Sequence, residues 1–374
     1  MQAQDLTSAE MNTVGSCSED NRRMEPSPVM DYVRAADGTT VAHLTIGTGP
    51  TVIWLPSLSH VLAQWRIPMF RTAYRQLSES LRLVLYDGRG TGSSDRRVAT
   101  DDLGIDAHLS DLEAVIAAVG GGPVALLGYY HSVPTAIAFA ADHPELVSRL
   151  LLFGGAARLR DTMSPAQTQA LLSLVDQDWG LFAESAAHAW MGWDAGESGR
   201  LFAEAFRTAA TPAFARAFFA AAQDIDVTDR LSRVIAPALV LHRQSQLQMP
   251  IEVSRALAQS LPNGTLIELA GSFPTLFHED APGDLELVIR YLLGEAADPT
   301  RSPLRGAHSA GDRLTARERE VLRQVAAGES NAGIASALGI SVHTVERHTA
   351  NLYRKIGARG RADAAAYAVR GGFA

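Results

Sequence analysis

The sequence predicts two domains, a large α/β domain followed by a small all-α domain. Over residues 28–295, short and nearly continuous apolar runs alternate with amphipathic stretches of helical period. That alternation is typical of a mostly parallel sheet with helices on both faces. Residues 313–374 show helical periodicity without such runs. A chain of 374 residues suits one large core and one small one.

The large domain is expected to begin with a β-hairpin. Asp37-Gly38 separates two strand-like runs in MDYVRAADGTTVAHLTIG, and this dipeptide between such runs is a hairpin signal. Six apolar runs then predict the parallel strands, at 52–55, 81–86, 123–128, 148–153, 237–242 and 265–269.

Two polar segments are expected to lie outside the domains. Residues 1–27 have no apolar core of a secretory signal, so we predict a disordered tail. Residues 296–312 are rich in Gly, Ala, Pro and Ser and predict a linker.

The single cysteine, Cys17, cannot form an internal disulfide, which fits a reducing cytoplasm. No apolar run reaches the roughly 18 to 20 residues of a membrane span, so we expect no membrane contact.

Charge is divided unevenly along the chain. From Ala310 onward there are 10 Lys and Arg against 6 Asp and Glu, whereas the rest has 23 against 35. A basic module on an acidic body is expected when only one domain meets nucleic acid.

One stretch of the large domain resembles the nucleophile elbow of an α/β-hydrolase, in which a strand ends in G-x-S-x-G and a helix follows. The stretch is ALLGYYHSVPTAIAFAADHPELV, residues 125–147, and Gly128 matches the first glycine. Counting from Gly128, the serine position holds Tyr130 and the second glycine position holds Ser132. YDGRGTGSSD, residues 86–95, resembles the D-x-R-G-x-G-x-S-D segment of the same family.

The resemblance covers residues 28–295 and implies an α/β-hydrolase fold with a helical lid at about 158–230. It also implies a serine, an acid, a histidine and an oxyanion loop. Here these positions hold Tyr130, Gln246 or Ser245, Pro274 or Thr275, and Pro56-Ser57. A phenol ionises near pH 10 and has no matching base in this sequence. We therefore predict a degenerate domain with no catalytic residue, cofactor or metal.

Two routes to an enzyme stay open. Ser132 could act as a non-standard nucleophile beside His131, although neighbouring side chains at a helix start point apart. His278 could serve as a base if its loop is threaded differently.

Without a triad, the fold leaves a pocket under the lid, suited to a small and mostly apolar ligand. The residues expected to line this pocket are Ser59, His60, Trp65, Tyr129, Tyr130, Trp190 and Trp193.

Residues 314–369 resemble the LuxR-type DNA-binding domain, in which four helices contain a helix-turn-helix. Thr315 and Glu318 have the spacing of a capping box at the first helix. Gly339 stands where the tight turn needs a permissive backbone, and Ser341 is expected to cap the third helix.

The third helix is expected to enter the major groove of double-stranded DNA with its N-terminal part. The candidate DNA-binding residues are Ser341, Val342, His343, Thr344, Glu346, Arg347, Asn351 and Lys355. The resemblance implies phosphate contacts for Ser341, Thr344, Asn351 and Lys355, and base contacts for Glu346, Arg347 and Ala350. It also implies a homodimer, for which ADAAAYAV near the C-terminus is a candidate contact surface or else part of the core.

Three hypotheses of function follow. The first is a sequence-specific, cytoplasmic transcription regulator that associates with the nucleoid when bound to DNA, and whose degenerate hydrolase domain senses a small molecule or mediates dimerisation. The second is a hydrolase fused to a DNA-binding domain. The third is a constitutive regulator whose first domain only dimerises or recruits a partner.

Overall fold

The computed structural model describes most of the chain between residues 28 and 370. The described ranges are 28–58, 60–100, 103–162, 165–191, 196–244, 249–271, 275–277, 281–296, 316–356, 358 and 360–370. The tail at 1–27 and, apart from residue 296, the linker at 296–312 lie outside them.

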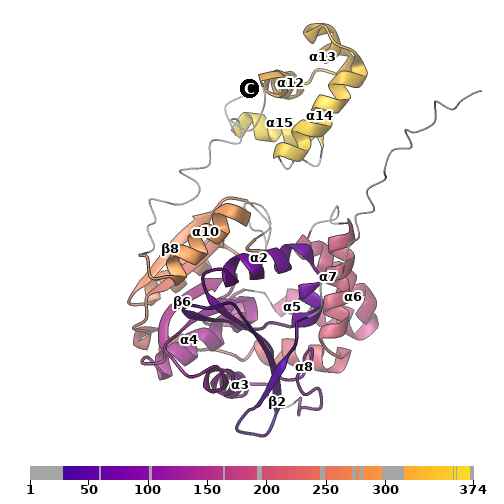
Figure 1. Ribbon diagram of the computed structural model, residues 1–374. Coiled ribbons are helices and arrows are strands. Elements are labelled where there is room, and N and C mark those ends of the chain that lie inside the picture. The colour runs from indigo at the N-terminus through magenta and orange to yellow at the C-terminus, as the bar shows by residue number, and fades with distance from the viewer. Residues whose placement is uncertain are drawn as a thin grey trace, which may run out of the picture.

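The larger domain is built on a sheet of eight strands in the order β1-β2-β4-β3-β5-β6-β7-β8. Helices surround this sheet (Figure 1). Strands β1 and β2 form the antiparallel hairpin, β2 pairs antiparallel with β4, and all other neighbours are parallel. The six apolar runs are all strands, which confirms the α/β prediction. The bounds are β1 Asp31–Arg34, β2 Thr40–Ile46, β3 Thr51–Trp54, β4 Arg82–Asp87, β5 Val124–Tyr129, β6 Val147–Phe153, β7 Ala238–Arg243 and β8 Gly264–Leu269.

Helices cover both faces of the sheet because its central strands are buried on both sides. One face packs against α1 (Val61–Trp65), α2 (Pro68–Ser78) and α10 (Ala281–Leu292). The other packs against α3 (Ile105–Ala118), α4 (Val133–Asp142) and α9 (Ile251–Ser260). Along β5, Leu127 joins the first core and Leu126 the second, as the two-residue period of a strand requires.

Four helices follow β6 and occupy the region predicted as a lid. They are α5 (Pro165–Gln177), α6 (Trp179–Met191), α7 (Gly196–Ala209) and α8 (Pro212–Ala222). Short 3-10 helices lie on either side, η2 (Leu159–Asp161) and η3 (Thr228–Arg233). Phe182, Phe214 and Phe218 centre a hydrophobic cluster of their own, so most of the lid aromatics pack helix against helix.

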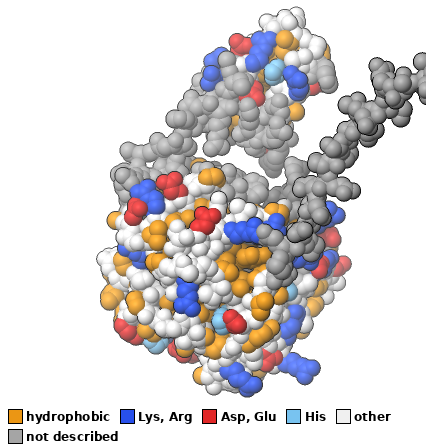
Figure 2. Space-filling model, in the orientation of Figure 1, with side chains coloured by type: hydrophobic (Ala, Val, Ile, Leu, Met, Phe, Trp, Pro, Cys, Tyr) orange, Lys and Arg blue, Asp and Glu red, His pale blue; other side chains and the backbone are white. Residues whose placement is uncertain are grey.

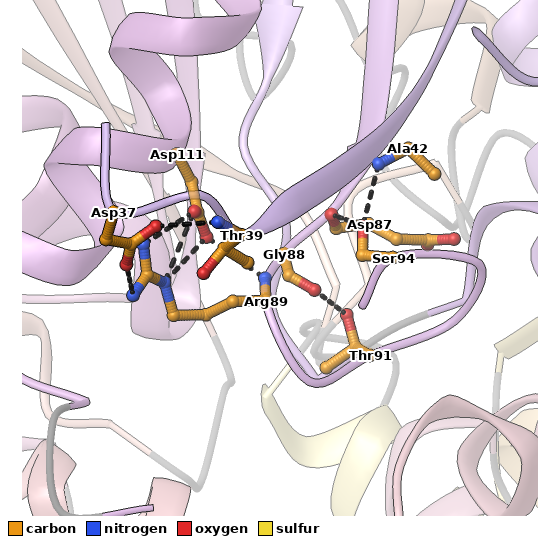
Figure 3. A network of polar contacts seen from close by, with 9 residues as sticks. All are labelled: Asp37, Thr39, Ala42, Asp87, Gly88, Arg89, Thr91, Ser94 and Asp111. Carbon is orange, nitrogen blue, oxygen red and sulfur yellow. Dashed lines mark hydrogen bonds and ion pairs between the residues drawn. The ribbon is translucent and has the colours of Figure 1, made fainter. Parts of the chain in front are cut away.

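A polar network fixes the loop after β4, the segment that resembled D-x-R-G-x-G-x-S-D (Figure 3). Arg89 donates to Asp111 of α3 at 2.9 Å and to Asp37 of the hairpin turn at 2.7 Å. The Ser94 hydroxyl donates to the carbonyl of Asp87 and accepts a backbone N–H of β2 at 2.8 Å. These contacts tie the loop to both the hairpin and α3, so the motif is structural here.

The C-terminal residues fold into four helices, α12 (Ala316–Ala326), α13 (Asn331–Leu338), α14 (Val342–Ile356) and α15 (Arg361–Arg370). Their core contains the residues expected from helical periodicity, with Val321, Ile334, Val345 and Leu352 fully buried. Ala364 of α15 joins that core, so this part of ADAAAYAV packs internally.

Capping explains where these helices begin and end. The Ser341 hydroxyl accepts the backbone N–H of Thr344 at 3.1 Å, which confirms the predicted cap of α14. Gly339 has φ +63° and ends α13 in the left-handed region. Ser330 caps α13 by accepting from Gly333 at 3.1 Å. Thr315, the predicted cap of α12, lies outside the described residues.

Candidate functional site

The structure keeps the sharp turn of a nucleophile elbow although its residue is a tyrosine. Tyr130 begins the 3-10 helix η1 (Tyr130–Ser132) between β5 and α4, with φ +53°. Among the described residues it is the only non-glycine with a positive φ. This conformation is costly for a bulky side chain, on the order of 1–3 kcal/mol. The backbone therefore holds Tyr130 in the strained geometry that the fold uses to project a side chain from the end of the sheet.

Two glycines after β6 make room for this turn. A Cβ atom on Gly154 would lie 2.6 Å from the Tyr130 ring, and one on Gly155 would lie 2.4 Å from the Tyr130 carbonyl oxygen. The Tyr130 ring packs edge-on against Tyr129, with ring centroids 5.0 Å apart, and against Phe153 at 5.9 Å. A phenol ring thus occupies the space beside the elbow.

Ser132, the alternative nucleophile, has its hydroxyl engaged by the backbone. Its Oγ accepts the N–H of Tyr129 at 2.9 Å and lies 3.3 Å from the carbonyl oxygen of Leu55. The residue is only 5% exposed. His131 packs its ring against Phe218 and Phe219, with centroids 5.5 Å away in both cases. Burial lowers the pKa of His131 to about 4, so this histidine is a weak base.

The other triad positions are only partly described. Gln246, Ser245 and Pro274 lie outside the described residues, as does His278. Thr275 is described and 1% exposed, and its hydroxyl has no hydrogen-bond partner among the described residues. A threonine hydroxyl supplies no base for acyl transfer.

A buried ion pair, which the sequence did not reveal, joins the end of β7 to α10, the helix after β8. Arg243, the last residue of β7, is fully buried and pairs with Asp284 of α10. Its guanidinium also donates to the carbonyl oxygens of Ala270 at 2.7 Å and Leu276 at 2.6 Å. In this arrangement the pair fixes the segment where the catalytic histidine of a hydrolase is expected.

A cavity of about 440 Å³ lies beside the elbow, between the carboxyl ends of the strands and the lid. Its walls are mostly apolar and come from both parts of the domain. From the sheet side they include Trp54, Pro56, Ser57, Tyr129, Tyr130 and His131. From the lid they include Leu171, Leu174, Phe182, Phe202, Phe206 and Phe219.

Of the residues predicted to line the pocket, Tyr129 and Tyr130 do so. His60 and Trp65 do not, and the structure corrects the expectation for these two. The His60 ring nitrogen Nδ1 lies 3.2 Å from the Thr208 hydroxyl of α7, and Trp65 stacks on Tyr74 with centroids 6.0 Å apart. His60, which precedes α1, and Trp65, its last residue, therefore contact other partners.

Val61 and Gln64, both within α1, line the cavity instead. Ser59, Trp193 and the side chain of Trp190 lie outside what the structure describes.

The candidate DNA-binding helix α14 presents one face to the core and another to solvent. Val345 and Leu352 point into the core, whereas Val342 is 43% exposed and Glu346 and Arg347 are exposed. Basic side chains lie among acidic ones on the visible surface of these C-terminal helices (Figure 2).

At the start of α14, the Ser341 and Thr344 hydroxyls lie 2.8 Å apart, close to the helix N-terminus, where phosphate oxygens bind favourably. The side chains of His343, Asn351 and Lys355 are outside the described part of the helix.

Comparison with known proteins agrees with this geometry. The sequence model of the α/β hydrolase fold family matches residues 50–281, and that of the bacterial regulatory proteins of the luxR family matches residues 312–368. The chain belongs to the α/β hydrolase fold family, and it carries a LuxR-family helix-turn-helix domain at its C-terminus.

Among individual proteins, the chain is similar to the "Putative carbamate hydrolase RutD" of Caulobacter sp. strain K31. The two are 27% identical over 70% of this chain and 94% of that protein. The C-terminal domain is 50% identical to the "Putative HTH-type transcriptional regulator YhjB" of Escherichia coli K12, over 14% of this chain and 26% of that protein.

A similar solved structure is the esterase EaEST from Exiguobacterium antarcticum. It covers 71% of this chain and 99% of its own, with a TM-score of 0.62 and 22% identity, a likeness that concerns the fold alone. No helix within the described ranges is long and apolar enough to cross a membrane.

Proposed function

We propose that the chain is a DNA-binding transcription regulator whose hydrolase-fold domain binds a small molecule and does not hydrolyse it. The observation that carries this proposal is Tyr130, held at the elbow with φ +53° beside a cavity of about 440 Å³. The LuxR-family domain supplies the DNA-binding module. A cavity whose elbow position holds tyrosine in place of serine, on a chain with that module, is best used to detect a ligand.

The lid offers a route from ligand to DNA. Residues of α5, α6, α7 and α8 line the cavity, so a bound molecule contacts helices that can shift against the sheet. A ligand changes DNA affinity only if it binds two arrangements of the protein with different affinity. We propose that the protein acts in the cytoplasm as a homodimer. Its two arrangements then differ in how the two α14 helices meet the two half-sites of the DNA. DNA affinity that stays constant while ligands demonstrably bind would refute the switch.

The second candidate function is hydrolysis, which the 27% identity to a protein named as a hydrolase favours. The test is turnover of an activated ester by the full chain, with a serine-directed covalent probe in a parallel sample. We expect neither turnover nor labelling above a denatured control. Turnover with a labelled Ser132, abolished in Ser132→Ala, would replace the sensor proposal by an enzyme.

Changing Tyr130 to serine should not restore hydrolysis. Tyr130→Ser places a hydroxyl at the elbow, but the adjacent His131 is a weak base because burial lowers its pKa to about 4, and Thr275 cannot take the proton. Ester turnover should stay at the level of the Tyr130→Phe control, and a tryptophan fluorescence spectrum should show that both variants are folded. Turnover by Tyr130→Ser alone would show that a base and an acid are present after all.

Two substitutions in α14 should separate base reading from phosphate binding. Arg347→Ala should weaken binding to the preferred DNA site by about 1–3 kcal/mol and relax its sequence preference. Lys355→Ala should weaken binding to all sequences and reduce the slope of log affinity against log salt by about one. The measurement is fluorescence anisotropy with a selected site over a salt series.

Arg323→Ala in α12 is the charge-matched control for these variants and should have a smaller effect. Suppose instead that Arg347→Ala weakened binding to all DNA sequences equally while Lys355→Ala altered only the sequence preference; that result would show that the assigned roles along α14 are wrong.

A further inference from the structure

The cavity wall contains no ionic side chain in the part of the chain that the structure describes. None of the described lining residues is Asp, Glu, Lys or Arg. The polar side-chain groups of this wall are the indole of Trp54, amides, hydroxyls and the imidazole of His131, and Gln64, Tyr74 and Tyr129 are among them.

Burial keeps three ionisable groups of this wall uncharged near neutral pH. Burial lowers the pKa of His131 to about 4, so its imidazole is neutral. Burial raises the pKa values of Tyr74 and Tyr129 above that of an exposed phenol. The position of the catalytic acid holds Gln246, which carries no charge wherever it is placed.

Two nearby ionisable side chains are engaged elsewhere. Asp87 accepts the backbone N–H groups of Val61 at 2.7 Å and Ser93 at 2.8 Å. Arg243 is paired with Asp284 and is fully buried. Neither Asp87 nor Arg243 lines the cavity, so a charged ligand would find no counter-ion in the described wall. An unpaired charge is strongly disfavoured in such surroundings.

A hydrogen bond fixes the orientation of the Gln64 amide in this apolar wall. The Gln64 amide oxygen accepts the hydroxyl of Tyr74 at 3.0 Å, and Tyr74 is itself buried on α2. Because the oxygen end of the Gln64 amide faces Tyr74, the nitrogen end is the one turned to other partners, and it can only donate. A carbonyl oxygen of a ligand is the matching acceptor.

We propose that the ligand of this cavity is an uncharged, mainly apolar molecule with a carbonyl oxygen that accepts from Gln64, and that carboxylates are excluded. This assignment rests on the sensor function proposed above. An ester, lactone, ketone or amide fits it, whereas the acid formed by hydrolysis of an ester or lactone does not. The domain would therefore distinguish such a compound from its own hydrolysis product.

The test compares two probes of nearly equal shape, 2-acetonaphthone and 2-naphthoate, by equilibrium dialysis against the full chain at pH 8. The ketone is not a substrate for ester hydrolysis, so its binding does not depend on whether the domain is an enzyme. We expect the ketone to bind and the anion to bind on the order of 100-fold more weakly, because its charge must be buried without a partner.

Two variants test the role of Gln64. Gln64→Leu should weaken binding of the ketone about tenfold, the usual order for one lost hydrogen bond, and leave the anion excluded. Gln64→Lys should strengthen binding of 2-naphthoate by supplying a counter-charge. Tryptophan fluorescence should show that each variant is folded.

The outcomes separate the two proposals. Equal affinity for ketone and anion would overturn the ligand class and leave the sensor function intact. Binding of neither probe would count against both. Ketone affinity unchanged in Gln64→Leu would overturn the assigned contact.

Discussion

Replacing Asp284 with alanine should lower the free energy of unfolding of the hydrolase-fold domain by about 3–5 kcal/mol. Arg243 and Asp284 are paired with side chains 0% and 1% exposed. Removal of the carboxylate leaves the guanidinium buried with carbonyl oxygens as its remaining partners among the described residues, and an uncompensated buried charge is costly. The charge-free double variant Arg243→Met/Asp284→Leu should recover much of this loss, because neither ion then has to be desolvated.

Urea denaturation followed by tryptophan fluorescence measures this effect in the full chain. All five tryptophans lie between residues 54 and 193, so the signal reports the larger domain. Glu295→Ala is the control, since its partner Arg290 is solvent-exposed and such pairs contribute little. An Asp284→Ala variant as stable as wild type would mean that water reaches Arg243.

The same substitution should also disturb the ligand cavity. Arg243 donates to the carbonyl of Leu276, and the next residue, Phe277, packs edge-on against Trp54 with ring centroids 5.8 Å apart. Trp54 lines the cavity. Thus the ion pair supports one cavity wall, and Asp284→Ala should weaken binding of 2-acetonaphthone even at temperatures where the variant is folded.

The sequence predicted the sheet because each parallel strand is buried on both faces and reads as one apolar run. PALVLH became β7 and PVALLG became most of β5, with boundaries shifted by one residue at each end. The elbow could be predicted for the same reason, because its signature, Gly128 and the helix after it, is contiguous in the sequence. Its backbone conformation at Tyr130 follows from that local context.

The sequence could not place side chains whose position depends on distant partners. Arg243 and Asp284 are 41 residues apart, and nothing in either neighbourhood marks them as a pair. For α1, of only five residues, the sequence did not determine the rotation of the helix. His60 and Trp65 were therefore expected in a wall that Val61 and Gln64 form.

The second large effect concerns Asp87, which is completely buried at the end of β4. Its carboxyl group accepts the N–H of Val61 at the start of α1 and that of Ser93 in the loop after β4. That loop also contacts the lid, because the Gly92 N–H donates to the carbonyl of Ala209 at 2.7 Å. Asp87 therefore connects the sheet with two segments next to the cavity.

Burial raises the pKa of Asp87 to about 7, although the two N–H donors and the positive charge of Arg96 oppose this shift. Between the unfolded pKa near 4 and the folded pKa near 7, the native state holds a proton that the unfolded state has lost. The stability that this proton contributes is present at low pH and is lost as the pH rises through 7. From pH 5 to pH 8 the loss should be about 2–3 kcal/mol.

Comparison with Asp87→Asn isolates this contribution. His108 and His131, whose pKa values burial lowers to about 4, make the whole protein less stable in acid. Their contribution is common to wild type and variant, so it cancels in the difference. The unfolding free energy of wild type minus that of Asp87→Asn should fall by about 2–3 kcal/mol between pH 5 and pH 8.

Asp87→Asn is also expected to be less stable than wild type at pH 8, because asparagine has one acceptor oxygen for two N–H donors. Urea titrations at half-unit pH steps, followed by tryptophan fluorescence, give both quantities, with Asp178→Asn on the lid as the exposed control. A difference that stays constant with pH would mean that Asp87 is ionised throughout. The hydrogen bonds from the N–H groups of Val61 and Ser93 would then stabilise the charged carboxylate by more than its burial costs. The cavity would also have an anion close behind its wall, so a carboxylate ligand would be repelled as well as left without a counter-ion.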